Sequence, residues 1–460
     1  MKSGSNNPPK PPSRRALLKS ASLGAALAPP SGILAQQRAA AVITGRKFRG
    51  WVSRGYGPGR TKLEELTLRP IAGRQVLVRT EASSLCYSNC SAVLGLQPAP
   101  PAGAPAGARR VSEMPLIQGH GGVGVVEAVG PEVRRVRVGD RVAICGTPQC
   151  GSCYMCLRGR SDMCQFLARQ GPDDLVPMAD LRDGTPVFQN SHIGGLAELM
   201  VTFEEWVAPV FTKASAVELG MVSSCVSVAG LGATTSQVLA SIGPAASVAV
   251  VGCGPLGLSA VQGARIAGAA RIIAIDPIKV RRELALKLGA THALDPVAEG
   301  PRLVQTVRAL TAGPTDHLWA GGRYLGGGFG AGSGPDFVVE AAGAEQAKPK
   351  LEAGPDPTGI QPLTQAWEMT APGGHLVTTS LVRGNIILPG TLFTIGGKTH
   401  HSGQAGGCSP LRDLQRFVEL MDAGRYDAKA LATRVVPLAQ MLDAYEEVLY
   451  RTTVTAIMTA

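Results

Sequence analysis

The chain has 460 residues, which is too long for one hydrophobic core and predicts two domains of ordinary size. Its net charge of +11 would suit a nucleic-acid-binding protein. The basic residues are scattered, however, and no basic stripe is interleaved with aromatic side chains. We therefore expect no nucleic-acid partner.

Residues 1–37 have the composition of a targeting segment. The stretch "SRRALLK" precedes a short Ala/Leu/Ser run that ends at Pro29. It resembles the twin-arginine export signal, and the apolar run is shorter than the roughly 20 residues of a membrane span. We expect the twin-arginine translocation machinery to carry the chain to the periplasm or outside the cell, with cleavage after Ala35. A disordered basic tail on a cytoplasmic protein is the alternative.

Four cysteines within fifteen residues have the spacing C-x2-C-x2-C-x7-C. This spacing can aim four thiolates at one tetrahedral Zn²⁺. Disulfides between such close neighbours are the alternative, but they would enclose very small loops and stabilise little. A closed four-cysteine site leaves no open position for substrate, so we interpret it as a structural zinc site. Its candidate ligands are Cys150, Cys153, Cys156 and Cys164.

A dinucleotide-binding pattern begins near residue 247. The apolar run Ser247–Val251 predicts a buried strand, and G-x-G-x-x-G follows at its end, leading into a predicted helix. In such a turn the glycines permit the bend, a close approach to pyrophosphate, and close packing of the helix on the strand. The helix N-terminus offers N–H donors to the phosphates. The candidate binding residues are Gly252, Gly254, Pro255, Leu256 and Gly257.

A second predicted strand, "RIIAID", ends in Asp276, about twenty residues past the glycine motif. Its carboxylate can accept hydrogen bonds from ribose hydroxyls and repel a 2′-phosphate. This favours NAD over NADP, and Arg281, five residues on, could soften the preference.

Later segments fit further units of the same sheet. Strands are expected in "ATHALDP", "DFVVEAAG" and "GGHLVTTS". Glycine- and proline-rich runs between them, "AGGRYLGGGFGAGSG" and "AKPKLEAGPDPTGIQP", are interpreted as surface insertions. His400 and His401 are expected in a solvent-facing loop, and Cys90, Cys145, Cys253 and Cys408 as buried or loop thiols.

From about Arg46 to its end, the chain resembles the zinc-dependent medium-chain alcohol dehydrogenases. The resemblance is carried by the four-cysteine loop, the glycine motif and the segments "RKFRGWV", "GRQVLVRTEASSLC", "GHGGVGVVEAVG", "VGDRVA", "GGLAELM" and "ALKLGATHALDP". It implies an α/β protein with a GroES-like, mainly β catalytic domain and a Rossmann domain of doubly wound parallel sheet. It also implies a homodimer or homotetramer.

The resemblance places catalytic zinc ligands at Cys86, His120 and Cys225, with a fourth position open to water or alcohol. Two Zn²⁺ per chain are therefore expected, one catalytic and one structural. The catalytic zinc would act as a Lewis acid toward the alcohol, and NAD would accept the hydride. Ser88 matches the hydroxyl that relays the alcohol proton, with a loop serine capping a turn as the plainer alternative.

The chain departs from the family pattern beside the expected catalytic zinc. Asn89 stands where an aspartate is usual, Gly121 where a glutamate is usual, and Ser91 where some members have a histidine. Loss of such supporting groups costs about 10–100-fold in metal affinity or activity. An inserted stretch, "QPAPPAGAPAGARR", lies between Cys86 and His120 and could reshape the substrate entrance.

These observations predict an export signal at 1–37, a catalytic domain at 38–225 and 396–460, and a Rossmann domain at 226–395. The expected function is oxidation of a small alcohol, or reduction of an aldehyde, with NAD and zinc. One alternative is a nicotinoprotein that is exported with tightly bound NAD. Another, which Asn89 and Gly121 favour, is an exported zinc- and nucleotide-binding protein without turnover.

Overall fold

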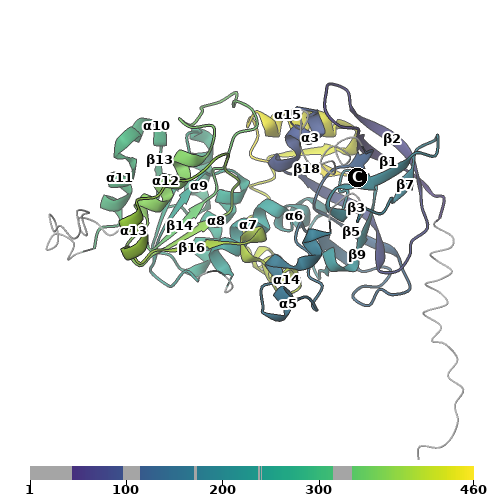
Figure 1. The fold of residues 1–460 in the computed structure, drawn as a ribbon, viewed down its shortest axis with the longest axis horizontal. Coiled ribbons are helices and arrows are strands. Elements are labelled where there is room, and N and C mark those ends of the chain that lie inside the picture. Colours follow the sequence, from purple (N-terminus) through teal and green to yellow (C-terminus); the bar gives the residue numbers. More distant parts are fainter. Residues whose placement is uncertain (1–43, 97–113, 170–173, 237–238, 240, 314–333) are drawn as a thin grey trace, which may run out of the picture.

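A computed structural model describes residues 44–96, 114–169, 174–236, 239, 241–313 and 334–460. The expected export signal at 1–37, the inserted stretch "QPAPPAGAPAGARR" at 97–110 and nearly all of the run "AGGRYLGGGFGAGSG" at 320–334 lie outside these residues. The described chain forms a mainly β lobe and an α/β lobe, at the right and the left of Figure 1, with helices between them. This confirms the predicted fold class, a GroES-like domain joined to a Rossmann domain.

The β lobe contains a closed barrel and a second, mostly antiparallel sheet. The barrel strands are β1 (Lys47–Ser53), β2 (Thr61–Leu68), β7 (Ala179–Asp180), β8 (Pro186–Gln189) and β4 (Leu116–Ile117). The second sheet runs in the order β10 (Val207–Pro209), β6 (Arg141–Ile144), β5 (Gly122–Val129), β3 (Gln75–Leu85), β18 (Ala456–Thr459) and β17 (Arg434–Pro437), and β9 (Leu199–Phe203) also pairs with β3. Because β18 pairs with β3, the end of the chain returns to this lobe.

The α/β lobe is built on a parallel sheet. Its strands are, in spatial order, β13 (His292–Leu294), β12 (Arg271–Ile275), β11 (Ser247–Val251), β14 (Phe337–Glu340), β15 (His375–Thr378) and β16 (Thr399–Ser402). The strands expected from the sequence are thus confirmed. His400 and His401 do not lie in a loop as expected, because both belong to β16. This strand also extends the sheet past residue 395, where the sequence pattern placed the end of the domain.

Helices cover both faces of the parallel sheet, which explains why β11 is buried at every position and apolar from Val248 to Val251. Val248 and Val250 belong to the core formed with α8 (Pro255–Ala267) and α9 (Lys279–Leu288). The alternate residues Ala249 and Val251 belong to the core formed with α11 (Leu303–Leu310) and α12 (Ile360–Met369). The shorter helices α10 (Pro296–Glu299) and α13 (Gly390–Ile395) complete this lobe.

Two helices in series, α6 (Ala216–Val222) and α7 (Cys225–Thr235), connect the lobes near the centre of Figure 1. Ser215 begins α6 with a capping box, and the Ser224 side chain caps the start of α7. Further helices are α3 (Cys90–Leu94), α5 (Tyr154–Leu157), α14 (Pro410–Asp422) and α15 (Met441–Leu449). Because α7 contacts both α8 and the segment after β16, its N-terminus is held firmly at the junction of the lobes.

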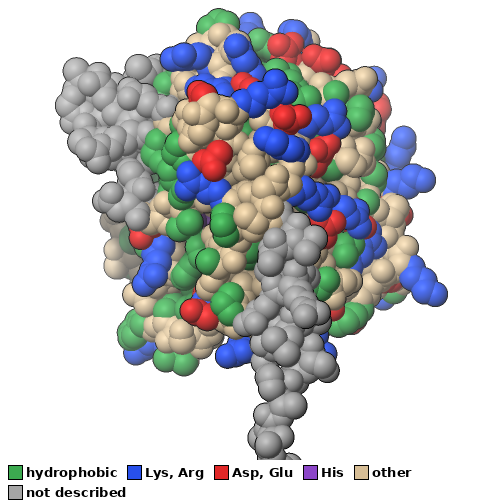
Figure 2. Space-filling model, turned by 90° about the vertical axis from the view of Figure 1, so that its right-hand side faces the viewer, with side chains coloured by type: hydrophobic (Ala, Val, Ile, Leu, Met, Phe, Trp, Pro, Cys, Tyr) green, Lys and Arg blue, Asp and Glu red, His purple; other side chains and the backbone are tan. Residues whose placement is uncertain are grey.

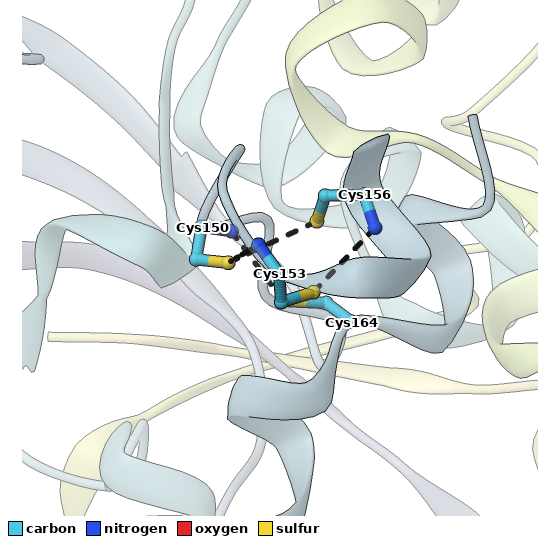
Figure 3. Close-up of side chains that lie close together, drawn as sticks. All are labelled: Cys150, Cys153, Cys156 and Cys164. Carbon is cyan, nitrogen blue, oxygen red and sulfur yellow. Dashed lines mark hydrogen bonds between the residues drawn. The ribbon is translucent and has the colours of Figure 1, made fainter. Parts of the chain in front are cut away.

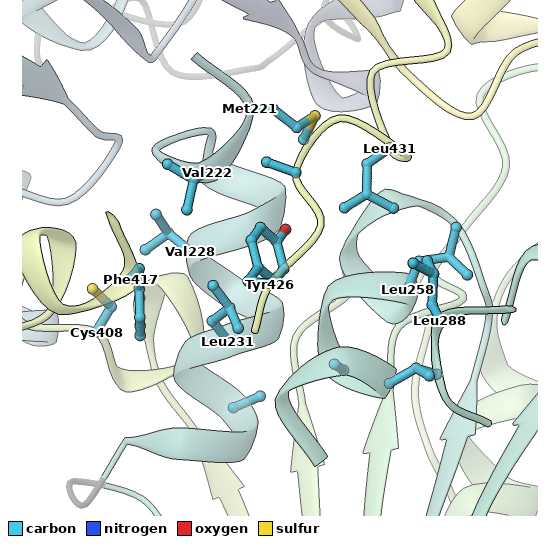
Figure 4. Packing of buried hydrophobic residues seen from close by; sticks show 14 of the residues in the cluster. Met221, Val222, Val228, Leu231, Leu258, Leu288, Cys408, Phe417, Tyr426 and Leu431 are labelled. Carbon is cyan, nitrogen blue, oxygen red and sulfur yellow. The ribbon is translucent and has the colours of Figure 1, made fainter. Parts of the chain in front are cut away.

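The core around α7 joins residues that are distant in the sequence (Figure 4). Leu231 and Val228 of α7 lie in one cluster with Leu258 of α8 and Phe417 of α14. The Tyr426 hydroxyl donates to Ser227 Oγ at 2.8 Å and lies 2.8 Å from Ser259 Oγ. This buried hydrogen-bond network satisfies the polar groups and fixes α7 against α8.

The surface of the β lobe carries mixed charge. On the face shown in Figure 2, basic and acidic side chains are interspersed. Ion pairs in this lobe include Arg49 with Glu198 and Arg69 with Asp180. Among the described residues, no single helix is long and apolar enough to cross a membrane. Helices α6 and α7, bent by 52°, meet that test of length and composition when taken together.

We predict that Leu231→Ala lowers the free energy of unfolding by about 2–5 kcal/mol, because it leaves a cavity in the core at the lobe junction. Leu286→Ala on α9 is the matched control, because Leu286 is 47% exposed, and its cost should stay below about 0.5 kcal/mol. Urea unfolding followed by circular dichroism measures both. If the two substitutions lowered the free energy of unfolding equally, the core around α7 would not be what stabilises the junction of the lobes.

Candidate active site and metal centres

A cavity of about 460 Å³ lies between the two lobes. Its volume falls within the usual range for small-molecule sites. Residues from the β lobe, from α7 and from the edge of the parallel sheet all line it, among them Cys86, Ser88, His120, Cys225, Gly254 and Asp276. The predicted metal ligands and the predicted nucleotide motif therefore border the same space.

The structure brings together the three residues that the family resemblance singled out. Cys86 directly follows β3, His120 lies two residues before β5, and Cys225 is the first residue of α7. The Cys225 sulfur lies 3.1 Å from the Cys86 sulfur and 3.1 Å from His120 Nε2. The three ligand atoms all lie within 4.8 Å of one another and face the cavity.

The electrostatics of this cluster suit a cation. The S–H of Cys225 donates to Cys86, and this bond, aided by the neighbouring His120 ring, lowers the pKa of Cys86 well below its usual value despite burial. The same contact, together with burial, raises the pKa of Cys225. Burial opposes protonation of His120, but the Cys86 thiolate outweighs it and raises the pKa of His120. A thiolate is thus available where a metal ligand is required.

Two sulfurs and one imidazole nitrogen, with a side open to the cavity, form a donor set that fits a catalytic zinc. Two sulfurs bound to one tetrahedral zinc at about 2.3 Å are separated by roughly 3.8 Å. The 3.1 Å between Cys86 and Cys225 is shorter, so metal binding requires these two side chains to move apart by less than an ångström.

Ser88 lies beside this cluster, in the short helix η1 (Tyr87–Asn89). Its hydroxyl is 3.2 Å from the Cys86 sulfur and 3.4 Å from His120 Nε2. It also lines the cavity. The hydroxyl is therefore placed to exchange a proton with a molecule bound next to the three ligands.

The departures from the family pattern leave no carboxylate at two positions beside the cluster. Asn89 is buried, and its Oδ1 has no hydrogen-bond partner within the described part of the chain. At Gly121 an added Cβ would lie 3.3 Å from the carbonyl oxygen of Ile144, which is a close contact. The positions that usually provide acidic support thus provide an amide oxygen without a partner among the described residues, and no side chain.

The four cysteines of the second cluster converge on one point (Figure 3). Their sulfurs lie within 4.8 Å of one another, and all four thiols are free. The Cys150 and Cys156 sulfurs are 4.0 Å apart, and those of Cys153 and Cys164 are 3.9 Å apart. These distances are close to the roughly 3.8 Å expected around a tetrahedral zinc. The residues present fit a closed, structural metal site.

Backbone donors favour the thiolate form at Cys150 and Cys153, whereas burial raises the pKa of Cys156 and Cys164. Burial acts to raise the pKa of Cys153, but the backbone N–H groups of Cys156 and Gln165 donate to its sulfur and hold that pKa at about 6. The N–H of Cys153 itself donates to the Cys150 sulfur at 3.3 Å. Such N–H···S bonds stabilise thiolates, which are the metal-binding form of cysteine.

The glycine-rich turn has the conformation that its sequence predicted. Gly252 has φ +91°, and a Cβ there would lie 2.6 Å from the backbone nitrogen of Ala342. A Cβ on Gly257 would lie 1.7 Å from the Gly252 carbonyl oxygen, so only glycine fits at the start of α8. Gly254 precedes α8 as its N-cap, and Pro255 and Leu256 follow it along the cavity. The turn therefore leaves the helix N-terminus open to an anion.

Asp276 and Arg281 also line the cavity. The Asp276 carboxylate accepts hydrogen bonds from the backbone N–H groups of Cys253 and Ile278, each at 2.7 Å. Each carboxylate oxygen can still accept another bond. Arg281 is 9% exposed, and burial lowers its pKa. A Cβ added to Gly254 would lie 3.7 Å from Arg281 Nη1, so this cation faces the start of α8.

Sequence reasoning missed several residues of the cavity wall. Tyr87, Glu345, Gln346 and Arg451 all line the cavity. Tyr87 could have been noticed because it follows Cys86 directly. For Arg451 the sequence offered no signal. In the structure its φ is +61°, which is uncommon for a residue other than glycine.

Comparisons with known proteins agree with this arrangement. Residues 72–212 match the family "Alcohol dehydrogenase GroES-like domain", and residues 255–422 match "Zinc-binding dehydrogenase". Geraniol dehydrogenase of Castellaniella defragrans is 30% identical over 387 residues, which cover 82% of this chain and 88% of that protein. The NDMA-dependent alcohol dehydrogenase of Amycolatopsis methanolica is 27% identical over 394 residues, covering 84% and 92%.

Solved structures give the same result for the fold. An alcohol dehydrogenase zinc-binding domain protein from Burkholderia ambifaria superposes with a TM-score of 0.73 at 26% identity, covering 90% of this chain and 99% of that one. Benzyl alcohol dehydrogenase from Acinetobacter calcoaceticus gives a TM-score of 0.70 at 22% identity, with the same coverage. The chain therefore belongs to the zinc-binding alcohol dehydrogenases of the medium-chain dehydrogenase family.

Proposed function

We propose that this protein is a zinc-dependent alcohol dehydrogenase that transfers a hydride between a small alcohol or aldehyde and NAD. The observation that carries the proposal is that two thiols, an imidazole and a glycine-rich turn line one cavity. Cys86, His120 and Cys225 would hold the catalytic zinc, and Cys150, Cys153, Cys156 and Cys164 the structural zinc. When bound, zinc supplies a Lewis acid and NAD a hydride acceptor.

The protein's own residues position the substrate and move its proton. The Ser88 hydroxyl, 3.4 Å from His120 Nε2, would take the proton of an alcohol bound beside the three metal ligands. Ser91 stands where some relatives have the histidine that ends the proton relay. Its hydroxyl donates to Gln346 Oε1, so the proton must leave Ser88 by another path, through water or the cofactor ribose. The cavity walls would hold the substrate and nucleotide against each other and exclude bulk water.

The charges around the nucleotide motif support a preference for NAD. Asp276 directly follows β12 and lines the cavity, where a 2′-phosphate would meet a second negative charge. Arg281 adds a positive charge nearby and is expected to reduce that discrimination without reversing it.

A second candidate is a non-catalytic zinc- and nucleotide-binding protein of the same fold. Asn89, whose buried oxygen has no partner in the part of the chain that the structure describes, and Gly121 favour it because both deprive the metal cluster of acidic support. Assembly as a homodimer or homotetramer stays a prediction from the family resemblance.

We predict two equivalents of zinc per chain in the purified protein, falling to one in Cys86→Ser or His120→Ala, because each variant removes a catalytic ligand and spares the four-cysteine site. Ser88→Ala is the matched control. It should keep both zinc ions while kcat/KM for alcohol oxidation falls about 100-fold, as expected when a proton relay is lost. Elemental analysis and steady-state kinetics measure these effects. One equivalent in the parent, unchanged in Cys86→Ser, would favour the non-catalytic candidate.

We predict that Arg281→Gln increases the preference for NAD over NADP about tenfold. In the parent, the Arg281 cation offsets the repulsion between Asp276 and a 2′-phosphate, and the substitution removes that cation. Lys279→Gln removes an exposed cation from the same helix and should leave the ratio unchanged. Dissociation constants for both dinucleotides, measured by titration calorimetry, give the ratio. If the variant loses affinity for NAD and for NADP equally, Arg281 instead binds a chemical group that the two dinucleotides share.

We also propose that the chain is exported by the twin-arginine route through residues 1–37. Changing both Arg14 and Arg15 to Lys should leave the protein in the cytoplasm, because that route reads the arginine pair itself. Lys10→Gln removes one charge nearby and should not alter export. Cell fractionation of a host with this translocation system measures the distribution. Identical distributions in all three proteins would rule the signal out.

A further inference from the structure

We propose that residues 344–356 form a strap that closes over the nucleotide cleft and holds the bound nucleotide between turnovers. This inference rests on the proposed binding of NAD in the cavity. The sequence pattern assigned most of this segment to a surface insertion, "AKPKLEAGPDPTGIQP". The structure places six residues of the strap on the cavity wall: Gly354, Pro355 and Asp356 from that insertion, and Ala344, Glu345 and Gln346 directly before it.

The first part of the strap is fastened to the β lobe beside the metal ligands. Gln346 Nε2 donates to the Tyr87 carbonyl oxygen at 2.6 Å, and the Gln346 backbone N–H donates to the Tyr87 hydroxyl at 2.7 Å. Gln346 Oε1 accepts the backbone N–H of Ser91 at 2.9 Å. One glutamine thus binds residues on both sides of Ser88.

An ion pair strengthens this attachment. Glu345 Oε1 lies 2.9 Å from Arg451 Nη1, and the two side chains are 12% and 13% exposed. Arg451 also donates to the Tyr87 hydroxyl at 3.5 Å. Its positive φ is uncommon for a residue with a side chain, so the surrounding contacts must hold it in place. Solvent screens such a pair less than it screens a surface salt bridge.

The middle of the strap also packs on the β lobe. Ala347 lies against the hydrophobic core of that lobe. The backbone N–H of Lys350 donates to the Tyr450 carbonyl oxygen at 3.0 Å, and the Lys350 ammonium lies 4.0 Å from the centre of the Tyr450 ring. The strap therefore begins in the Rossmann domain and docks on the catalytic domain over several residues.

The two ends of the strap remain tied to the Rossmann domain. The N–H of Ala344 donates to the Leu381 carbonyl oxygen at 2.7 Å. At the other end, a Cβ added to Gly354 would lie 3.9 Å from Pro277, which follows Asp276 directly. The strap thus runs from the metal ligands to the residue that would contact the adenosine ribose. A nucleotide under it cannot leave until Glu345 and Gln346 release the β lobe.

Retention of the nucleotide implies a second organic substrate. The alcohol loses its C–H hydride to NAD⁺ and its O–H proton through Ser88, which gives an aldehyde or ketone and NADH. If NADH stays bound, a second aldehyde or ketone must enter and take the hydride at carbon and a proton at oxygen. That compound leaves as an alcohol, and NAD⁺ is restored in place. The net reaction is an exchange of oxidation state between two alcohol–carbonyl pairs.

The experiment measures nucleotide release directly. The full chain is loaded with NADH, and displacement by excess NAD⁺ is followed by NADH fluorescence in the parent, Glu345→Gln, Gln346→Ala and Glu352→Gln. The control, Glu352→Gln, neutralises an exposed carboxylate on the same strap. We expect release to be about tenfold faster in Glu345→Gln and Gln346→Ala, because interface losses act mainly on dissociation rates, and within about twofold of the parent in the control.

Arg451→Gln completes a double-mutant cycle with Glu345→Gln. If the ion pair closes the strap, the double variant releases NADH no faster than either single variant. Equal release rates in the parent and all variants would overturn the strap proposal and leave the dehydrogenase proposal standing. Failure of the parent to bind NADH would overturn both. Glu345→Gln is nearly isosteric and carries the test if Gln346→Ala does not fold.

Discussion

The candidate site depends on one constraint, the convergence of Cys86, His120 and Cys225 on a single point. His120 and Cys225 are separated by 105 residues, and Cys86 and Cys225 by 139. The thiols and the ring can meet only if β3, β5 and the start of α7 keep their relative positions. The core around α7, with the Tyr426 network inside it, provides that rigidity. Ligands that already lie close together need little rearrangement to bind a cation, here a separation of the Cys86 and Cys225 sulfurs by less than an ångström.

The same convergence concentrates charge in the cavity. The lowered pKa of Cys86 favours negative charge at one end, while Arg281 provides a cation near the start of α8 and Arg451 a second cation on the cavity wall. A cavity with separated charges can orient a metal at one end and a phosphate-bearing molecule at the other. Asp276 and Glu345 then limit how far the positive region extends. The neutral Asn89 and Gly121 stand out against this pattern because the metal ligands lack acidic support at those two positions.

The four-cysteine loop stands apart from this chemistry. Its sulfurs are arranged as a closed site (Figure 3), and it contacts the end of β16 through Arg160 and the segment after β16 through Ser161. Ser161 donates to Ser409 at 2.6 Å, just before α14. The loop therefore stabilises the segment after β16 that packs on α7. This is a structural role, as expected for a closed four-cysteine site.

The features that short stretches determine were predictable from the sequence. The strand β11, the glycine turn and α8 follow from local apolar patterning and from the steric demand at Gly252 and Gly257. The four-cysteine cluster follows from spacing alone. His400 and His401 were misplaced because a polar edge strand such as β16 has no apolar alternation to mark it.

The amino-acid sequence by itself determined the four-cysteine loop and the nucleotide turn, because each depends on residues that are neighbours along the chain, whereas the full fold class was implied by the family resemblance. The grouping of Cys86, His120 and Cys225 came from a family resemblance, since individually those residues are ordinary. Only the tertiary structure decided that Gln346 binds Tyr87 and that Glu345 pairs with Arg451. These contacts join segments more than 100 residues apart, and a glycine- and proline-rich run carries no periodic pattern that would indicate where it docks.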